Sequence, residues 1–168
     1  MVEVRLSAVR VDLQSNTPVL LLTEAEGLGR TLPIFIGAPE ATAIAFAIQG
    51  VATPRPMTHD LLRDLIDVLG ATLVRVVITE LRSATYFAEL QLKRGDEELT
   101  VSSRPSDAVA LAVRTESPLY VADELMDAEG ILLPPEEEDE DGESGNPDEI
   151  VGEFREFLDQ VRPEDFSS

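Results

Sequence analysis

The sequence predicts an α+β fold, in which a mostly antiparallel or mixed sheet built from two β-β-β-α units has helices packed on it. Three apolar segments at hairpin spacing occur first within residues 2–36 and again within residues 73–102, and such trios are typical of antiparallel meanders. A helical stretch that begins at a proline and is rich in small apolar residues follows each trio. These two observations give the order β-β-β-α around residues 2–49 and again around residues 72–114.

The first unit begins with a long segment, residues 2–13, in which apolar residues alternate with period two and then slip by one position near Val9. A slip within an alternating strand predicts a β-bulge. Turns separate this segment from strands at 19–22 and 32–36. A helix at 39–49 follows and is small or apolar on nearly every face, which predicts burial on all sides. It would lie either between the sheet and a second subunit or in the centre of the core.

A second helix, at residues 58–69, precedes the second unit, with Thr58 as the expected N-cap and a leucine-rich stripe along one face. The second unit then has strands at 73–81, 86–92 and 99–102, a helix at 105–114 and a short strand at 119–121. Two Arg-Pro segments, which begin at Arg55 and Arg104, each place an arginine, a hydroxyl and an aspartate at a helix start. An internal duplication is one interpretation, although the two segments do not occupy identical places in the two units.

The composition of the 168 residues fits a folded globular protein and excludes several chemistries. Apolar residues make up 43%, and no apolar run approaches the ~18 residues of a membrane helix. There is no cysteine and one histidine, His59, which excludes disulfides, thiol nucleophiles and multi-histidine zinc motifs. The N-terminus enters a strand pattern at once, so we expect no secretory signal peptide, no membrane association and a cytoplasmic location.

Charge is distributed unevenly along the chain. The net charge is -20, of which residues 1–134 carry -8 and residues 135–168 carry -12. Phosphate binding depends largely on Lys and Arg, so this balance excludes a passive basic groove for nucleic acid. Any nucleic-acid chemistry would need a local arginine cluster, a bound cation, or both.

The composition changes at Pro134 and predicts three regions: a domain at 1–134, an acidic disordered linker at 135–146, and a C-terminal amphipathic helix and tail at 147–168. The last region carries an apolar stripe at helical spacing, formed by Ile150, Val151, Phe154, Phe157, Leu158 and Val161. We expect this stripe to pack on the body, on a neighbouring subunit or on a partner protein.

The segment Ser103-Arg104-Pro105-Ser106-Asp107 is the first candidate site. A helix N-terminus offers free N–H groups and partial positive charge, which suit phosphate oxygens. Arg104 and Ser106 would add a guanidinium and a hydroxyl to that site. The alternative is that Ser and Asp only cap the helix.

The second candidate site is the start of the helix at 58–69, with Arg55, His59 and Asp60. A histidine can serve as general base, and Mg²⁺ or Mn²⁺ prefers carboxylates and water. If the side chains of Glu40, Asp60 and Asp107 converge, they would bind a divalent cation, which would allow an acidic protein to bind a polyanion such as nucleic acid. The alternative is again a capped helix with a surface histidine.

Four segments carry a resemblance to a known family: LPIFIG at 32–37 with Glu40-Ala41 after it, RPMTHDL at 55–61, SRPSDAVA at 103–110, and PLYV at 118–121. In this order and spacing they resemble the bifunctional nuclease family, small bacterial and plant proteins to which DNase and RNase activity is attributed. The resemblance covers residues 1–134, and the tail, with phenylalanines at 154, 157 and 166, is similar to actinobacterial members. The family implies an α+β fold, an oligomer, and metal-assisted phosphodiester hydrolysis without clear sequence preference.

Two functional hypotheses follow. In the first, the protein is a homo-oligomer (a dimer or trimer) that hydrolyses DNA and RNA: Arg55, Arg104 and Ser106 bind phosphate, His59, Asp60 and Asp107 are catalytic, and Glu40, Asp60 and Asp107 bind Mg²⁺ or Mn²⁺. In the second, it is a non-enzymatic regulatory or scaffold module that oligomerises through the Ala-rich helix and docks a partner through the C-terminal helix. A sensor that uses the helix N-termini as an anion site is a third option.

Overall fold

The structure, a computed structural model, describes residues 1–133, which form one compact unit. Its strands are β1 (Val2–Asp12), β2 (Thr17–Glu24), β3 (Thr31–Phe35), β4 (Thr72–Arg82), β5 (Thr85–Arg94), β6 (Glu97–Ser103) and β7 (Leu119–Val121). Its helices are α1 (Ala38–Ile48), α2 (Thr58–Val68), α3 (Pro105–Thr115) and α4 (Asp123–Glu129). The predicted linker at 135–146 and helix at 147–168 lie outside the described residues.

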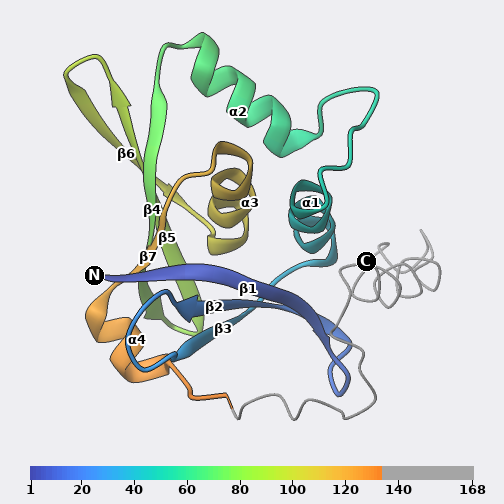
Figure 1. Ribbon diagram of the computed structural model, residues 1–168, viewed down its shortest axis with the longest axis vertical. Helices are drawn as coiled ribbons and strands as arrows, with labels where there is room; N and C mark the ends of the chain where they lie inside the picture. Colours follow the sequence, from blue (N-terminus) through green and yellow to red (C-terminus); the bar gives the residue numbers. More distant parts are fainter. Residues whose placement is uncertain (134–168) are drawn as a thin grey trace. The chain divides into compact units, whose positions relative to one another are not determined.

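The two β-β-β-α units share one seven-stranded mixed sheet, in the order β3-β2-β1-β7-β4-β5-β6 (Figure 1). Each unit is an antiparallel meander, and the short strand β7 joins the two. Leu119 of β7 pairs with Val4 of β1 in an antiparallel ladder and with Val76 of β4 in a parallel one. The predicted α+β class with a mixed sheet is therefore confirmed.

Strand β1 contains the predicted bulge. Its register against β2 shifts between Leu6 and Ala8, one residue before the position at which the apolar alternation slips. Because side chains alternate across a strand, one extra residue lets apolar residues on both sides of the bulge face the same core.

Helix α3 forms the centre of the helical layer. It packs against β4 and β5 and against α1 and α2, and it begins with Pro105 at the first helical position. Seven of its residues are buried: Pro105, Ser106, Ala108, Val109, Ala110, Leu111 and Ala112. Its run of small residues suits close contact on several sides.

Helix α1, the Ala-rich helix, is not buried on all sides within the described unit, so the interpretation that places it in the centre of the core is wrong. Ala41, Ala43 and Ile44 are buried, but the side chain of Ile48 is 53% exposed. The helix packs on α3 and reaches the sheet mainly at β1 and β2, and part of its surface stays open. Whether a second subunit covers that surface stays a prediction.

Helix α2 begins at Thr58, the first residue of the predicted range, but its N-cap is Met57 rather than Thr58. The backbone N–H of Met57 donates to Asp60 Oδ2 at 2.9 Å, so the aspartate closes the first turn. The leucine stripe is only partly covered: Leu61, Leu65 and Leu69 are 52%, 48% and 66% exposed. No described helix is long and apolar enough to cross a membrane.

Candidate functional site

The two Arg-Pro segments meet because α1, α2 and α3 pack together near their N-termini. Helices α1 and α3 each have a proline in the first turn, and no side chain of the described residues caps either one. The N-cap position of α3 is Arg104, whose carbonyl accepts the N–H of Ala108 at 3.0 Å. Side-chain capping, the alternative for the segment 103–107, is therefore not what this structure shows.

Arg104 joins the first turns of α1 and α3. Its guanidinium donates to Asp107 through Nε at 2.7 Å and through Nη2 at 3.0 Å. Nη2 also lies 2.8 Å from Glu40 Oε1. Both carboxylates are in the third position of their helices, where the helix dipole favours negative charge.

His59 completes the group from the first turn of α2. Its Nε2 lies 3.1 Å from Asp107 Oδ1, and the ring is buried, with 10% of the side chain exposed. We call Glu40, His59, Arg104 and Asp107 the helix-start cluster. The arrangement links three helices through four side chains that come from three separate parts of the sequence.

The protonation of Asp107 fixes the tautomer of His59. Burial raises the pKa of Asp107, but hydrogen bonds from Arg104 and His59 outweigh burial and hold the pKa below its usual value. An ionised carboxylate only accepts hydrogen bonds, so Nε2–H is the donor and the Nδ1 of a neutral ring carries a lone pair. Nδ1 is buried and has no hydrogen-bond partner among the described residues.

Glu40 takes its position because residue 37 is glycine. The backbone of Gly37 is extended, a conformation open to any residue, but a Cβ there would overlap Glu40 Oε2. The carboxylate folds back over its own helix start and reaches Arg104 from there. The missing side chain at 37, rather than backbone freedom, makes this possible.

Asp60 lies next to His59 in sequence but faces a different partner. Its Oδ1 accepts a hydrogen bond from Arg114 Nε at 2.6 Å, and this contact is the main reason that its pKa is lowered. Arg114 is 4% exposed and also donates to the carbonyls of Ala43 and Ala110. The carboxylate thus ties α2 to α1 and α3, and Arg114 is the residue that the sequence reasoning missed.

The remaining predicted site residues differ in accessibility. Ser106 is 6% exposed and lies in the first turn of α3. Arg55 is exposed, in the loop before α2, and its guanidinium has no hydrogen bond or ion pair to any described residue. Of these two residues, Arg55 is the one whose guanidinium has no partner among the described residues and is exposed for binding a phosphate.

The predicted ligands Glu40, Asp60 and Asp107 do not form one set for a divalent cation. Glu40 and Asp107 bind the guanidinium of Arg104, whereas Asp60 binds that of Arg114. Within residues 1–133 there is no group of three acidic or histidine side chains that could hold a metal ion. The residues as arranged do not fit a preformed Mg²⁺ or Mn²⁺ site, and we derive no catalytic step through a metal.

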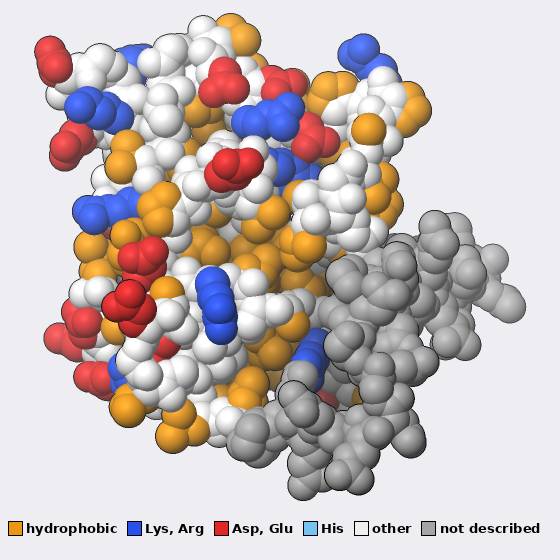
Figure 2. Space-filling view, viewed as in Figure 1, with side chains coloured by type: hydrophobic (Ala, Val, Ile, Leu, Met, Phe, Trp, Pro, Cys, Tyr) orange, Lys and Arg blue, Asp and Glu red, His pale blue; other side chains and the backbone are white. Residues whose placement is uncertain are grey.

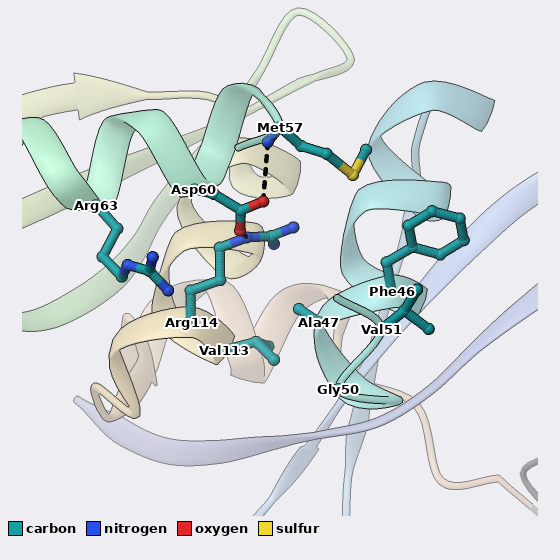
Figure 3. Close-up of a pocket in the computed structure, with 9 residues that line it drawn as sticks. All are labelled: Phe46, Ala47, Gly50, Val51, Met57, Asp60, Arg63, Val113 and Arg114. Atoms are coloured by element: carbon teal, nitrogen blue, oxygen red, sulfur yellow. Dashed lines mark hydrogen bonds and ion pairs between the residues drawn. The ribbon is translucent and has the colours of Figure 1, made fainter. Parts of the chain in front are cut away.

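A cavity of about 280 Å³ has Asp60 and Arg114 in its lining (Figure 3). Phe46 and Val51 lie at one end, with Met57 reaching over from the start of α2, and Asp60, Arg63 and Arg114 lie at the other. Ala47, Gly50 and Val113 complete the wall. No sequence motif indicated this cavity, because its lining comes from three helices and a loop.

Charges of both signs are mixed over this side of the molecule. Figure 2 shows Lys or Arg and Asp or Glu side chains next to one another over α2 and α3, and hydrophobic side chains gathered across the middle of the face. No continuous basic surface is visible on it.

Comparison with known proteins gives a family and several relatives. The sequence model of one protein family, the bifunctional nuclease domain, matches residues 20–134 of this chain. An uncharacterised protein of Mycobacterium tuberculosis is 48% identical over 166 residues, which cover 99% of this chain and 98% of that protein. Bifunctional nuclease 2 of Arabidopsis thaliana is 32% identical over 117 residues, and bifunctional nuclease 1 of the same plant is 28% identical over 119. These matches cover 68% and 69% of this chain but 36% and 37% of the plant proteins.

Proposed function

This chain belongs to the bifunctional nuclease domain family, as its motifs predict, and on that premise we propose that it hydrolyses phosphodiester bonds of DNA and RNA at the helix-start cluster. The observation that carries the proposal is the His59–Asp107 pair. A buried histidine that is oriented by a carboxylate, and whose second nitrogen has no partner among residues 1–133, is an arrangement suited to proton transfer. A buried polar atom without a partner costs about 1–3 kcal/mol, and a catalytic role is one of the reasons for which such an atom is kept.

In this mechanism His59 acts as the general base. Nδ1 carries the lone pair and accepts a proton from the attacking water, while Asp107 stabilises the imidazolium that results. Nδ1 is buried, so a local opening of the first turn of α2 has to admit that water. The imidazolium then gives its proton to the leaving oxygen.

In this mechanism, groups around the helix-start cluster bind the phosphate. The uncapped N–H groups of α1 and α3 and the free guanidinium of Arg55 attract the phosphate oxygens. Arg104 is 66% exposed but already shares its charge with two carboxylates, so it orients Asp107 and Glu40 more than it adds net positive charge. Mg²⁺ or Mn²⁺ would have to bind together with the substrate.

The test is a cleavage assay on protein purified by two independent routes. Labelled DNA and RNA are incubated with Mg²⁺, Mn²⁺ or EDTA, and wild type is compared with His59→Gln. Loss of the general base should lower the rate about 10²–10⁴-fold. Arg94→Ala, which removes an exposed arginine with an i,i+3 acidic partner, is the control and should cleave like wild type. Equal rates for His59→Gln and wild type would refute the proposed site, and EDTA resistance would refute metal assistance.

The alternative function is a non-enzymatic oligomeric module, and the exposed face of α2 favours it. Leu61, Leu65, Val68 and Leu69 lie on successive turns and are between 48% and 82% exposed. Exposed apolar patches of this kind mark interaction surfaces. Absence of cleavage under every condition, with a dimer or trimer in solution, would support this alternative over the nuclease.

A further inference from the structure

The cavity beside Asp60 has an apolar end and a polar end, and its charges are balanced. Asp60 is paired with Arg114, and Arg63 is paired with Asp64 through Nε and Nη2. Asp60 lines the cavity and Asp64 does not, but both guanidinium groups of the lining already share their charge with a carboxylate, so neither offers a free positive charge to an anion. The lining therefore suits a neutral group with a flat apolar face and a polar edge.

The size and the wall restrict that group further. A volume of about 280 Å³ is slightly below the range of drug-sized sites, ~300–1,000 Å³, so the cavity takes one ring system with little else. Phe46, Val51 and Met57 offer apolar surface against which a ring can stack (Figure 3). At the other end, Asp60 oxygens keep lone pairs for an N–H donor, and Arg63 Nη1 makes no hydrogen bond to a described residue and can donate.

The cavity is connected to the helix-start cluster by the chain itself. Met57 and Asp60 line the cavity, and His59 lies between them in the same helical turn. Along α3, Asp107 and Arg114 are seven residues apart, or ~10 Å at the rise of an α-helix. That separation is comparable with the reach from the backbone of a nucleotide to its base.

We propose that this cavity is a nucleobase subsite, and that the substrate class of the helix-start cluster is single-stranded or unpaired nucleic acid. The inference rests on the proposed nuclease function. A base can enter such a cavity only when it is unstacked and unpaired, which costs least in a single strand. Stacking accepts every base, so the subsite is compatible with hydrolysis that has little sequence preference.

The binding test uses mononucleotides, which contain no phosphodiester to cleave, and ribose 5-phosphate as the probe that lacks a base. Titration calorimetry with AMP, GMP, CMP and UMP should show saturable binding at least ~5-fold tighter than binding of ribose 5-phosphate, because stacking of one base contributes ~1–3 kcal/mol. Val51→Trp places a bulky ring in the cavity and should abolish the difference. Val101→Trp, on an exposed valine of β6 outside the cavity, is the matched control and should preserve it.

A second variant keeps the subsite testable if Val51→Trp fails to fold. A cleavage assay then separates the nucleobase subsite from the proposed nuclease function. Arg63→Gln should weaken mononucleotide binding several-fold, whereas Arg94→Gln should not. Equal affinity for mononucleotides and ribose 5-phosphate, or full binding by Val51→Trp, overturns the subsite even if the protein cleaves nucleic acid. Base-dependent binding by a protein that cleaves nothing supports the subsite and refutes the nuclease. Equal cleavage of single and double strands contradicts the substrate class.

Discussion

The substitution Asp60→Asn tests whether the carboxylate of Asp60 stabilises the fold or takes part in catalysis. Asp60 is 24% exposed and its partner Arg114 is 4% exposed. Asparagine keeps one oxygen for Arg114, but it loses the charge and places an amide N–H₂ against the backbone N–H of Met57. The substitution therefore removes the cap of α2 and half of a buried ion pair, while Arg114 keeps its contacts with two backbone carbonyls.

The magnitude follows from these losses. A lost cap costs ~1 kcal/mol, and breaking a fully buried pair costs ~3–5 kcal/mol. Here one hydrogen bond survives and Asp60 is partly solvated, so we expect a total of about 2–3 kcal/mol in the free energy of unfolding. For a folded unit of this size that lowers the Tm by ~10 °C.

Urea unfolding followed by far-ultraviolet circular dichroism measures the effect, with Asp64→Asn as the control. Asp64 pairs with Arg63 at 2.7 Å, but both side chains are about 40% exposed, so the control should lose less than ~0.5 kcal/mol. Below its unfolding transition, Asp60→Asn should still cleave at a rate within ~10-fold of wild type, because no catalytic group is removed. A variant as stable as wild type that has lost cleavage would refute this reasoning and make Asp60 catalytic.

Three further predictions address the cluster and the surface. Gly37→Ala should displace the Glu40 carboxylate and reduce cleavage, with less than ~1 kcal/mol lost in stability because the carboxylate is the end of a flexible side chain; unchanged cleavage would mean that Glu40 is dispensable. The lowered pKa of Asp107 means that its contribution to stability is present above the unfolded value of 3.8 and is lost as the pH falls through the folded pKa. Wild type should therefore exceed Asp107→Asn in urea stability at pH 7, with the difference shrinking as the pH falls below 3.8, and a difference that grows in acid would contradict the assignment. Leu61→Lys with Leu65→Lys should shift the mass measured by light scattering from oligomer toward monomer, whereas an unchanged mass would show that this face is not the interface.

The local structure could be predicted from the sequence wherever the apolar residues have a clear periodicity or a proline or glycine marks the end of an element. The alternating strands, the bulge in β1 and the Pro-initiated helices all leave such patterns, and each is present in the structure. The position of α1 could not be predicted in this way, because alanines on every face give no direction to the helix. The helix with most of its residues buried is instead α3. It follows β6 in the chain and packs on β5 and β4, and it precedes β7, which pairs between β1 and β4.

The candidate site was predictable as residue types but not as pairings. Both Arg-Pro segments were expected to carry chemistry, and the structure does bring His59 to Asp107. A single sequence does not tell which carboxylate faces which arginine, since that depends on how α1, α2 and α3 cross. Arg114, in the last turn of an apolar helix, takes Asp60 away from the predicted ligand set.

The most direct test of the account measures cleavage of a single-stranded oligonucleotide by wild type, Asp107→Asn and Glu97→Gln. Asp107 and Glu97 both accept an ion pair from an arginine three residues earlier, but only Asp107 also orients His59. The account predicts a loss of at least ~10²-fold for Asp107→Asn and wild-type cleavage for Glu97→Gln. Equal cleavage by all three proteins would contradict it and move the active site, or the activity itself, away from the helix-start cluster.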